Sequence, residues 1–449
     1  MNYSQENVRP GKADNLVGTP GNKSPKPSID WGRWLFLALM AIFLLAVGYR
    51  TIYNVAWNDV ERGDFTVYRA AGQAVIDGTN IYKAQNIHGW LYVYPPPFAI
   101  LTVPFAKLPL AWGSGLWYLI SLAGLISATI MAVKLAGEVA PSAVGKNNAG
   151  CVWQMPLADA WTLWQVPVLL ASPWLVSGLM RCQASEFMIW LMIAAIYFWW
   201  RGHHAWGGMA LAAATLIKAF PIALLAYFAW QRQWRFVAAF LFFLSVGGLI
   251  LPSAVYGWQK NLDYWQQWGQ IVAGPALSAN QTREGNFLYA QLLDSQKPRN
   301  QSLEALLLSL KTPPQQTKPL LAVIALGMFA VMAWTAKKSA GKTQLVVVSA
   351  FVMWNLLIPP ISETHYFGLL VLPFAVLTAI LLHDNDLFSR RLALGALLLC
   401  FVFSLWTNLD KSMELQRLLC WASLGVWSVL LVVAQRRFGA KPTADSLAE

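Results

Sequence analysis

Long apolar runs, separated by short polar and basic loops, repeat along most of this chain. Examples are residues 34–47, 236–251, 320–333 and 392–405. A helix that crosses a bilayer needs roughly 20 apolar residues, or somewhat fewer where flanking side chains snorkel to the interface. The repeated runs therefore predict an all-α, polytopic transmembrane helical bundle with roughly 12–14 membrane segments.

The composition agrees with a membrane protein. Of the 449 residues, 57% are hydrophobic and only 12% are charged, whereas a soluble protein carries about a quarter charged residues. In a soluble protein, the net charge of +12 would suggest a nucleic-acid partner. Here the basic residues fall in short loops between apolar runs, as cytoplasmic loops of membrane proteins do. We therefore expect membrane lipid as a partner and no nucleic acid.

The basic loops also orient the predicted segments. Clusters at residues 201–204, 232–235, 337–342, 390–391 and 436–437 are typical of cytoplasmic loops. They predict spans near residues 33–50, 236–251, 319–336, 344–359, 366–383, 392–407 and 416–434.

This topology gives two cytoplasmic tails and one transmembrane domain. The tail 1–31 has too little apolar surface to order itself, and the second tail is 437–449. The domain extends over residues 32–436. Its predicted outer loops are residues 51–95, 257–318 and 362–365.

Two apolar stretches are interrupted by proline. Residues 205–230 contain Lys218-Ala-Phe-Pro221, and each half reaches only about 18 Å at 1.5 Å per residue. Residues 160–182 contain Pro167 and Pro173, where we expect a second break. Broken membrane helices are tolerated where they line a cavity rather than lipid, so both stretches predict cavity walls.

The first outer loop holds the main candidate for chemistry. Phe65, Tyr68, Ala71 and Val75 follow a helical period, and a glycine at position 78 suits the end of that helix. The residue before the helix is an aspartate, Asp64.

Asp64 has two interpretations. Aspartate is a preferred N-cap, so its role can be purely structural. A carboxylate at the lip of a membrane cavity also suits a general base. Asp59 and Glu61 lie close by and are rivals for that role.

Lys218 is the second candidate. A lysine among apolar residues at a helix break either snorkels to the headgroups or binds an anionic phosphate at membrane depth. Further polar residues mark three other outer positions. These are Arg181 with Gln183, Glu363 with His365, and Arg283 with Asn286, the last pair being suited to an acceptor.

The residues indicate no cofactor. The four cysteines are far apart, and we find no ligand cluster that predicts a metal site. A GxxxxGK[ST] loop and a dinucleotide fingerprint are both missing, which disfavours a nucleotide as donor or fuel.

Several motifs together resemble glycosyltransferase family 87. They are Asp64 with Tyr68 and Ala71, Gly78-Thr-Asn-Ile-Tyr82, Tyr94-Pro-Pro-Pro-Phe98, Pro104 with Leu108-Pro109, Cys182-Gln183, Ile217-Lys-Ala-Phe-Pro221, Gly285-Asn286 and Ser362-Glu-Thr-His-Tyr366. The family usually has glycine at the position of Cys182, and tryptophan at that of Glu363. These departures bear on the sugar more than on the reaction type.

The resemblance implies a polyprenyl-phosphate-dependent mannosyltransferase of the GT-C fold in a bacterial inner membrane, with its active site on the outer face. Asp64 would be the base, while Lys218 and His365 would lie near the donor phosphate. The donor or acceptor would also be contacted by Tyr68, Arg181, Gln183, Arg283, Asn286 and Glu363. A hexose would pass from the polyprenyl phosphate to a lipid or glycan hydroxyl with inversion.

Two other functions stay open from the residues. A transporter or flippase of lipid-linked sugars would also use broken helices and a buried lysine. An O-antigen ligase or polymerase would join larger lipid-linked glycans. The size of the product separates the ligase from a hexosyltransferase, and covalent transfer separates both enzymes from the transporter.

Overall fold

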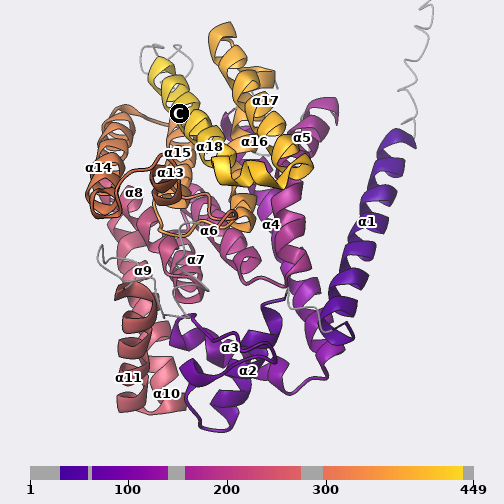
Figure 1. Ribbon diagram of the computed structural model, residues 1–449. Helices are drawn as coiled ribbons and strands as arrows, with labels where there is room; N and C mark the ends of the chain where they lie inside the picture. Colours follow the sequence, from indigo (N-terminus) through magenta and orange to yellow (C-terminus); the bar gives the residue numbers. More distant parts are fainter. Residues whose placement is uncertain (1–30, 59–62, 140–156, 275–296, 438–449) are drawn as a thin grey trace, which may run out of the picture. The chain divides into compact units, whose positions relative to one another are not determined.

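A computed structural model describes residues 31–58, 63–139, 157–274 and 297–437 (Figure 1). The chain divides into two units, residues 1–46 and residues 47–449. The first unit contributes the beginning of α1 (Trp31–Ala56). All other described elements, and the site below, belong to the second unit. The predicted tails at both ends lie almost entirely outside the described residues.

Helices account for nearly all the regular structure of the described residues, as the sequence predicts. Within the described part of the chain, eight helical segments are long and apolar enough to cross a membrane. They are α1, α4 (Leu110–Val139), α5 (Leu157–Met180), α9–α10 (Trp234–Tyr256), α14 (Pro314–Lys338), η7–α16 (Thr364–His383), α17 (Leu387–Leu409) and α18 (Leu418–Arg436). Five shorter apolar helical segments accompany them: Pro96–Ala106, Ser185–Trp200, His204–Ile217, Phe220–Trp230 and Thr343–Leu357. The protein is therefore a multi-pass membrane protein.

One deeply buried helix of this bundle is α16 (Val371–His383). It packs against α4, α5, α15 (Thr343–Leu357) and α17. Its side chains from Val371 to Ile380 are all buried. By contrast, many large apolar side chains of α9 and α17 are exposed, which suits contact with lipid tails rather than water.

The expected break at Lys218 is confirmed. Helix α7 (His204–Ile217) ends there, and a 3-10 turn, η3 (Phe220–Leu224), leads into α8 (Leu225–Trp230). Lys218 itself has extended backbone geometry. The short helices thus meet at a lysine, as the sequence predicts.

The expected break in residues 160–182 is wrong. Helix α5 continues through Pro167 and Pro173 to Met180. Each proline removes one backbone hydrogen bond. In an apolar environment, a helix still pairs most of the remaining backbone groups, so continuing it costs less than unwinding it.

The segment between α1 and α3 (Pro96–Ala106) folds as a small helical layer. Helix α2 (Phe65–Ile76) and the 3-10 helix η1 (Ile81–Lys83) form it. As predicted, α2 ends just before Gly78, whose φ of +67° favours glycine. Gly72 lets α2 approach α3, because a Cβ there would lie 2.8 Å from the Thr102 carbonyl oxygen.

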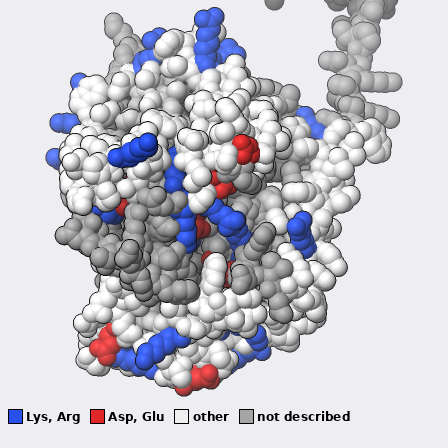
Figure 2. Space-filling model, viewed as in Figure 1, with Lys and Arg blue, Asp and Glu red and all other residues white. Residues whose placement is uncertain are grey.

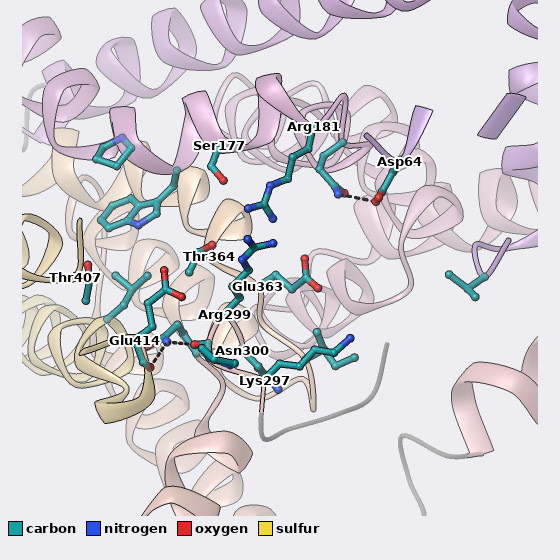
Figure 3. Close-up of a pocket in the computed structure, with 18 of the residues that line it drawn as sticks. Asp64, Ser177, Arg181, Lys297, Arg299, Asn300, Glu363, Thr364, Thr407 and Glu414 are labelled. Carbon is teal, nitrogen blue, oxygen red and sulfur yellow. Dashed lines mark hydrogen bonds between the residues drawn. The ribbon is translucent and has the colours of Figure 1, made fainter. Parts of the chain in front are cut away.

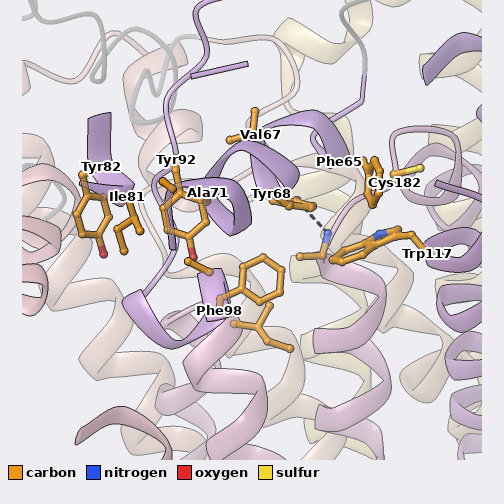
Figure 4. Packing of buried hydrophobic residues seen from close by; sticks show 14 of the residues in the cluster. Phe65, Val67, Tyr68, Ala71, Ile81, Tyr82, Tyr92, Phe98, Trp117 and Cys182 are labelled. Carbon is orange, nitrogen blue, oxygen red and sulfur yellow. Dashed lines mark hydrogen bonds between the residues drawn. The ribbon is translucent and has the colours of Figure 1, made fainter. Parts of the chain in front are cut away.

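Aromatic rings fix α2 in place. Tyr68 packs against Trp117 and Phe98, with ring centroids 5.1 and 5.3 Å apart, and Phe65 packs against Trp117 at 5.7 Å. Figure 4 shows these rings gathered around α2. Such pairs each contribute about 0.5–1.5 kcal/mol beyond their buried area. The start of α2, where Asp64 lies, is therefore rigidly held.

Helix α11 (Trp258–Trp268) clamps the same layer from another side. Tyr264 donates its hydroxyl to the Thr79 carbonyl at 3.0 Å, and the Trp268 indole donates to the Val93 carbonyl at 3.2 Å. Lys260 donates to the Gly78 carbonyl at 2.7 Å. The side chains of α11 thus bind the backbone of the layer.

Candidate functional site

A cavity of about 760 Å³ opens beside the start of α2. Its walls come from several parts of the chain: Asp64, the segment Trp90–Tyr94, α5 with the turn that leads to α6 (Ser185–Trp200), the segments Lys297–Gln301 and Ile361–Thr364, and the end of α17 with the following 3-10 helix η8 (Lys411–Gln416) and the start of α18. Figure 2 shows acidic and basic side chains close together in a hollow near the middle of the face that it displays. A cavity of this size suits a ligand of several hundred daltons.

Asp64 holds the N-cap position of α2, but its side chain makes no capping hydrogen bond. Instead, Oδ2 accepts a hydrogen bond of 2.5 Å from Gln183 Nε2. The hydroxyls of Tyr94 and Tyr68 donate to the same oxygen at 3.3 and 3.5 Å. The capping interpretation is therefore wrong for the side chain, which faces the cavity (Figure 3).

The two tyrosines form a support for this carboxylate. Their hydroxyl oxygens lie 2.9 Å apart, and the Tyr68 hydroxyl also accepts from the backbone N–H of Ala184 at 3.2 Å. The backbone N–H of Asp64 donates to the Arg181 carbonyl at 3.0 Å. Asp64 is thus joined on both sides to the α5–α6 turn.

The surroundings of Asp64 make it a stronger base than an exposed carboxylate. Burial and the nearby Glu363 raise its pKa, while Lys218, the Gln183 hydrogen bond and Arg181 lower it by less. A general base works best when its pKa lies near the working pH. A raised pKa is a property that a general base at this position would need.

Two guanidinium groups face one another across the middle of the cavity. They belong to Arg181 and Arg299, as Figure 3 shows. Burial and the Arg299 charge both lower the pKa of Arg181, yet a guanidinium stays protonated in proteins. Two like charges in this arrangement are unfavourable unless an anion lies between them. The pair is thus suited to bind a phosphate.

Other charged residues complete the walls. Lys297, Glu363 and Glu414 also line the cavity. In Figure 3, Glu363 lies between the arginine pair and Asp64, while Glu414 and Thr407 lie at the opposite end. The cavity therefore holds carboxylates and cationic side chains in neighbouring places.

Lys218 and His365 lie behind the wall rather than in it. Lys218 is 9% exposed and donates to the Tyr366 hydroxyl at 3.0 Å, with its Nζ 5.6 Å from the centre of the Tyr94 ring. The snorkelling interpretation of Lys218 does not fit this inward direction. His365 is 1% exposed, and its Nδ1 lies 3.4 Å from a carboxylate oxygen of Glu363. Neither residue lines the cavity: Lys218 lies near the Tyr94 ring and His365 lies against Glu363, and these two neighbours do line it.

Most of the predicted site residues come together. Asp64, Arg181, Gln183 and Glu363 line the cavity, and Tyr68 lies behind Asp64 and donates a hydrogen bond to it. The remaining candidates, Arg283 and Asn286, lie outside the described residues, as do the rival carboxylates Asp59 and Glu61. Sequence analysis missed Lys297 and Arg299, although they follow Arg283 in the same polar segment.

A family model for glycosyltransferase family 87 matches residues 92–360, more than half of the chain. The chain belongs to glycosyltransferase family 87. It is thus a membrane glycosyltransferase, as the motifs predicted. No curated protein matches the chain.

The matched region of this family 87 enzyme contains Arg181, Gln183 and Lys218. It begins after Asp64 and ends before Glu363 and His365. The family match therefore does not extend to Asp64.

Proposed function

We propose that this family 87 enzyme transfers a hexose, namely mannose, from a polyprenyl-phosphate donor to a hydroxyl of a lipid or glycan. The observation that carries the proposal is the placement of one carboxylate, Asp64, and two facing guanidiniums, Arg181 and Arg299, in a single cavity. Such a cavity provides a base for the acceptor and cations for the phosphate.

A sugar phosphate already carries a competent leaving group, so no acid has to protonate it. The reaction needs a base for the attacking hydroxyl and positive charge where the phosphate charge grows. One carboxylate is enough for this task, whereas glycoside hydrolysis uses two. The site offers Asp64 as the carboxylate that points at the cavity with a supported geometry.

In the proposed step, the Asp64 carboxylate takes the proton of the acceptor hydroxyl. The acceptor oxygen attacks the anomeric carbon and forms the new glycosidic bond. The bond from that carbon to the phosphate oxygen breaks, and its electron pair stays on the polyprenyl phosphate. A single displacement of this kind inverts the anomeric configuration. Arg181 and Arg299 stabilise the leaving phosphate, and Asp64 then releases its proton to water.

Lys218 and His365 have supporting roles in this proposal. The charge of Lys218 lowers the pKa of Asp64 and so favours its ionised form. His365 lies against Glu363, whose negative charge raises the pKa of Asp64. We place the active site on the outer face of a bacterial inner membrane, because the basic loops lie on the other side of the predicted topology.

The test uses the purified protein in nanodiscs with radiolabelled polyprenyl-phosphate-mannose and a lipid extract of the source cells. Wild type and D64N are assayed side by side, and products are separated by chromatography. A labelled product made by wild type alone supports the transferase and its base. Equal product from both proteins keeps the enzyme and rejects Asp64 as base.

Two other outcomes would replace the proposal. Saturable binding of the lipid without any product, across the acceptors of the extract, would favour a transporter of lipid-linked sugars. Transfer of an oligosaccharide block, but not of a single hexose, would favour a ligase or polymerase.

A further inference from the structure

A buried arginine lies next to the cavity and takes no part in the chemistry proposed above. Arg417 follows η8 at the start of α18 and is 3% exposed. Its backbone has a φ of +55°, a left-handed conformation that is costly for a residue with a side chain. A strained, buried, charged residue needs a compensating set of contacts.

Three of the hydrogen bonds of Arg417 go to one short turn. Arg417 Nη1 donates to the carbonyl oxygens of Lys297, Pro298 and Asn300, at 2.7, 3.0 and 2.7 Å. Hydrogen bonds from a charged donor are worth roughly 1.5–3 kcal/mol each. One side chain therefore gathers three carbonyls of a turn that lies more than a hundred residues away in sequence.

The same turn is fixed from its other sides. The Asn300 side chain donates to the Pro360 carbonyl at 2.8 Å and accepts from the Ser362 N–H at 2.9 Å. The Gln301 side chain donates to the carbonyls of Pro298 and Glu414, at 2.8 and 2.9 Å. The turn is thus tied both to η8 and to the segment that carries Glu363.

The restraint has a purpose that can be read from the side chains of the turn. Lys297 and Arg299 line the cavity, and Arg299 faces Arg181. An unrestrained arginine would turn away from a like charge toward water. Holding the turn keeps the Arg299 guanidinium where a phosphate can bridge it to Arg181.

We propose that Arg417 is a positioning residue for the phosphate site: it fixes the turn Lys297–Asn300 so that Arg299 stays opposite Arg181. This inference rests on the proposed function, because it assigns the arginine pair to the donor phosphate. Arg417 touches no substrate in this account, and it acts through the turn alone.

The first experiment compares R417M and R417K with wild type in initial-rate assays over a range of donor concentrations. R417M is expected to raise the donor KM by about ten- to a hundredfold with a smaller change in kcat, because a small displacement of a binding group has effects of this size. R417K is expected to restore part of the loss, since an ammonium can donate to three carbonyls. An unchanged donor KM in R417M overturns the inference.

A double-substitution cycle with Arg299 separates positioning from general stability. If Arg417 acts through Arg299, R299M and R299M/R417M should have donor KM values within about a factor of two, because the two changes remove one interaction. Multiplied effects of the two changes would overturn the inference. The matched control is R436M, which removes an ion pair with Asp386 of 2.6 Å at the other end of the same helix, about 27 Å away. Its donor KM should equal that of wild type.

Two further measurements cover the remaining outcomes. If R417M does not fold, Q301A removes a neighbouring restraint on the turn and must raise the donor KM in its place, or the inference fails. Binding of polyprenyl phosphate, followed by the shift of the melting temperature in nanodiscs, requires no sugar transfer. If the wild-type protein shows no turnover and R417M weakens the binding of polyprenyl phosphate, the proposed function is refuted and the phosphate site is supported. If R417M and wild type bind polyprenyl phosphate equally well, the inference is refuted.

Discussion

Replacing Asp64 by asparagine changes the charge of one side chain and little else. Aspartate and asparagine have the same shape. Gln183 Nε2, which lies 2.5 Å from the Asp64 carboxylate, can therefore still donate a hydrogen bond to the amide oxygen of the new side chain. The aromatic packing of Tyr68 around α2 is untouched. D64N therefore tests proton abstraction rather than the architecture of the site.

The size of the effect follows from the role. Positioned proton transfer contributes about a hundred- to ten-thousandfold to a rate. The supported geometry of Asp64 places it in the middle of that range, so we expect kcat to fall by about a thousandfold, or about 4 kcal/mol in the barrier. The donor KM should change little, because the arginine pair remains.

The pH dependence gives an independent check. Burial and Glu363 raise the pKa of Asp64 above its usual value of about 3.9. The base acts when ionised, so the wild-type rate should rise with pH through this raised pKa, and the residual rate of D64N should lack that limb. A wild-type limb that survives in D64N would refute the reasoning.

D64N should lower the activity without lowering the melting temperature. A carboxyl whose pKa is raised by folding contributes stability below its unfolded pKa and loses it as the pH rises through the folded pKa. At neutral pH, D64N removes this cost, so its melting temperature in detergent should equal or exceed that of wild type. A marked fall in melting temperature would mean that the lost rate reflects misfolding.

Three further changes probe the surroundings. Q183A removes the hydrogen bond that lowers the pKa of Asp64, so the acid limb of the pH–rate profile should move to higher pH; an unmoved limb contradicts this. R181M should raise the donor KM by about ten- to a hundredfold, the loss expected for charged hydrogen bonds, and a KM like that of wild type would remove Arg181 from the phosphate site. In G178A, the added methyl group would overlap the buried Glu186 carboxylate, so unfolding should become easier by about 1–3 kcal/mol; thermal melting in detergent measures this, and an unchanged midpoint would count against the packing described.

The sequence predicted those parts of the fold that depend on residues close together in the chain. The helical period after Asp64 and the glycine at position 78 indicated the extent of α2. The lysine–proline motif indicated the end of α7 at Lys218. By contrast, the prolines of α5 misled the prediction, because the apolar environment favours helix over unwound backbone more strongly than water does.

The spacing of residues along the chain could not predict which side chains bind Asp64. Gln183 lies 119 residues away in sequence, and nothing in the pattern around Asp64 indicates that its carboxylate turns toward that residue rather than toward the N-terminus of α2. The same holds for Arg299, whose neighbours in sequence do not indicate which way its side chain points. Only tertiary packing shows that Arg299 faces the cavity.

The walls of the cavity come from distant parts of the chain, from Asp64 to Glu414. At a synthesis rate of about 5–20 residues per second, the ribosome needs roughly 20–70 s to pass from one to the other. During that interval, Asp64 is joined first by Arg181, then by Lys297 and Arg299, and only at the end by Glu414. The complete cavity therefore exists only once almost the whole chain has been made, so that the site forms late in synthesis.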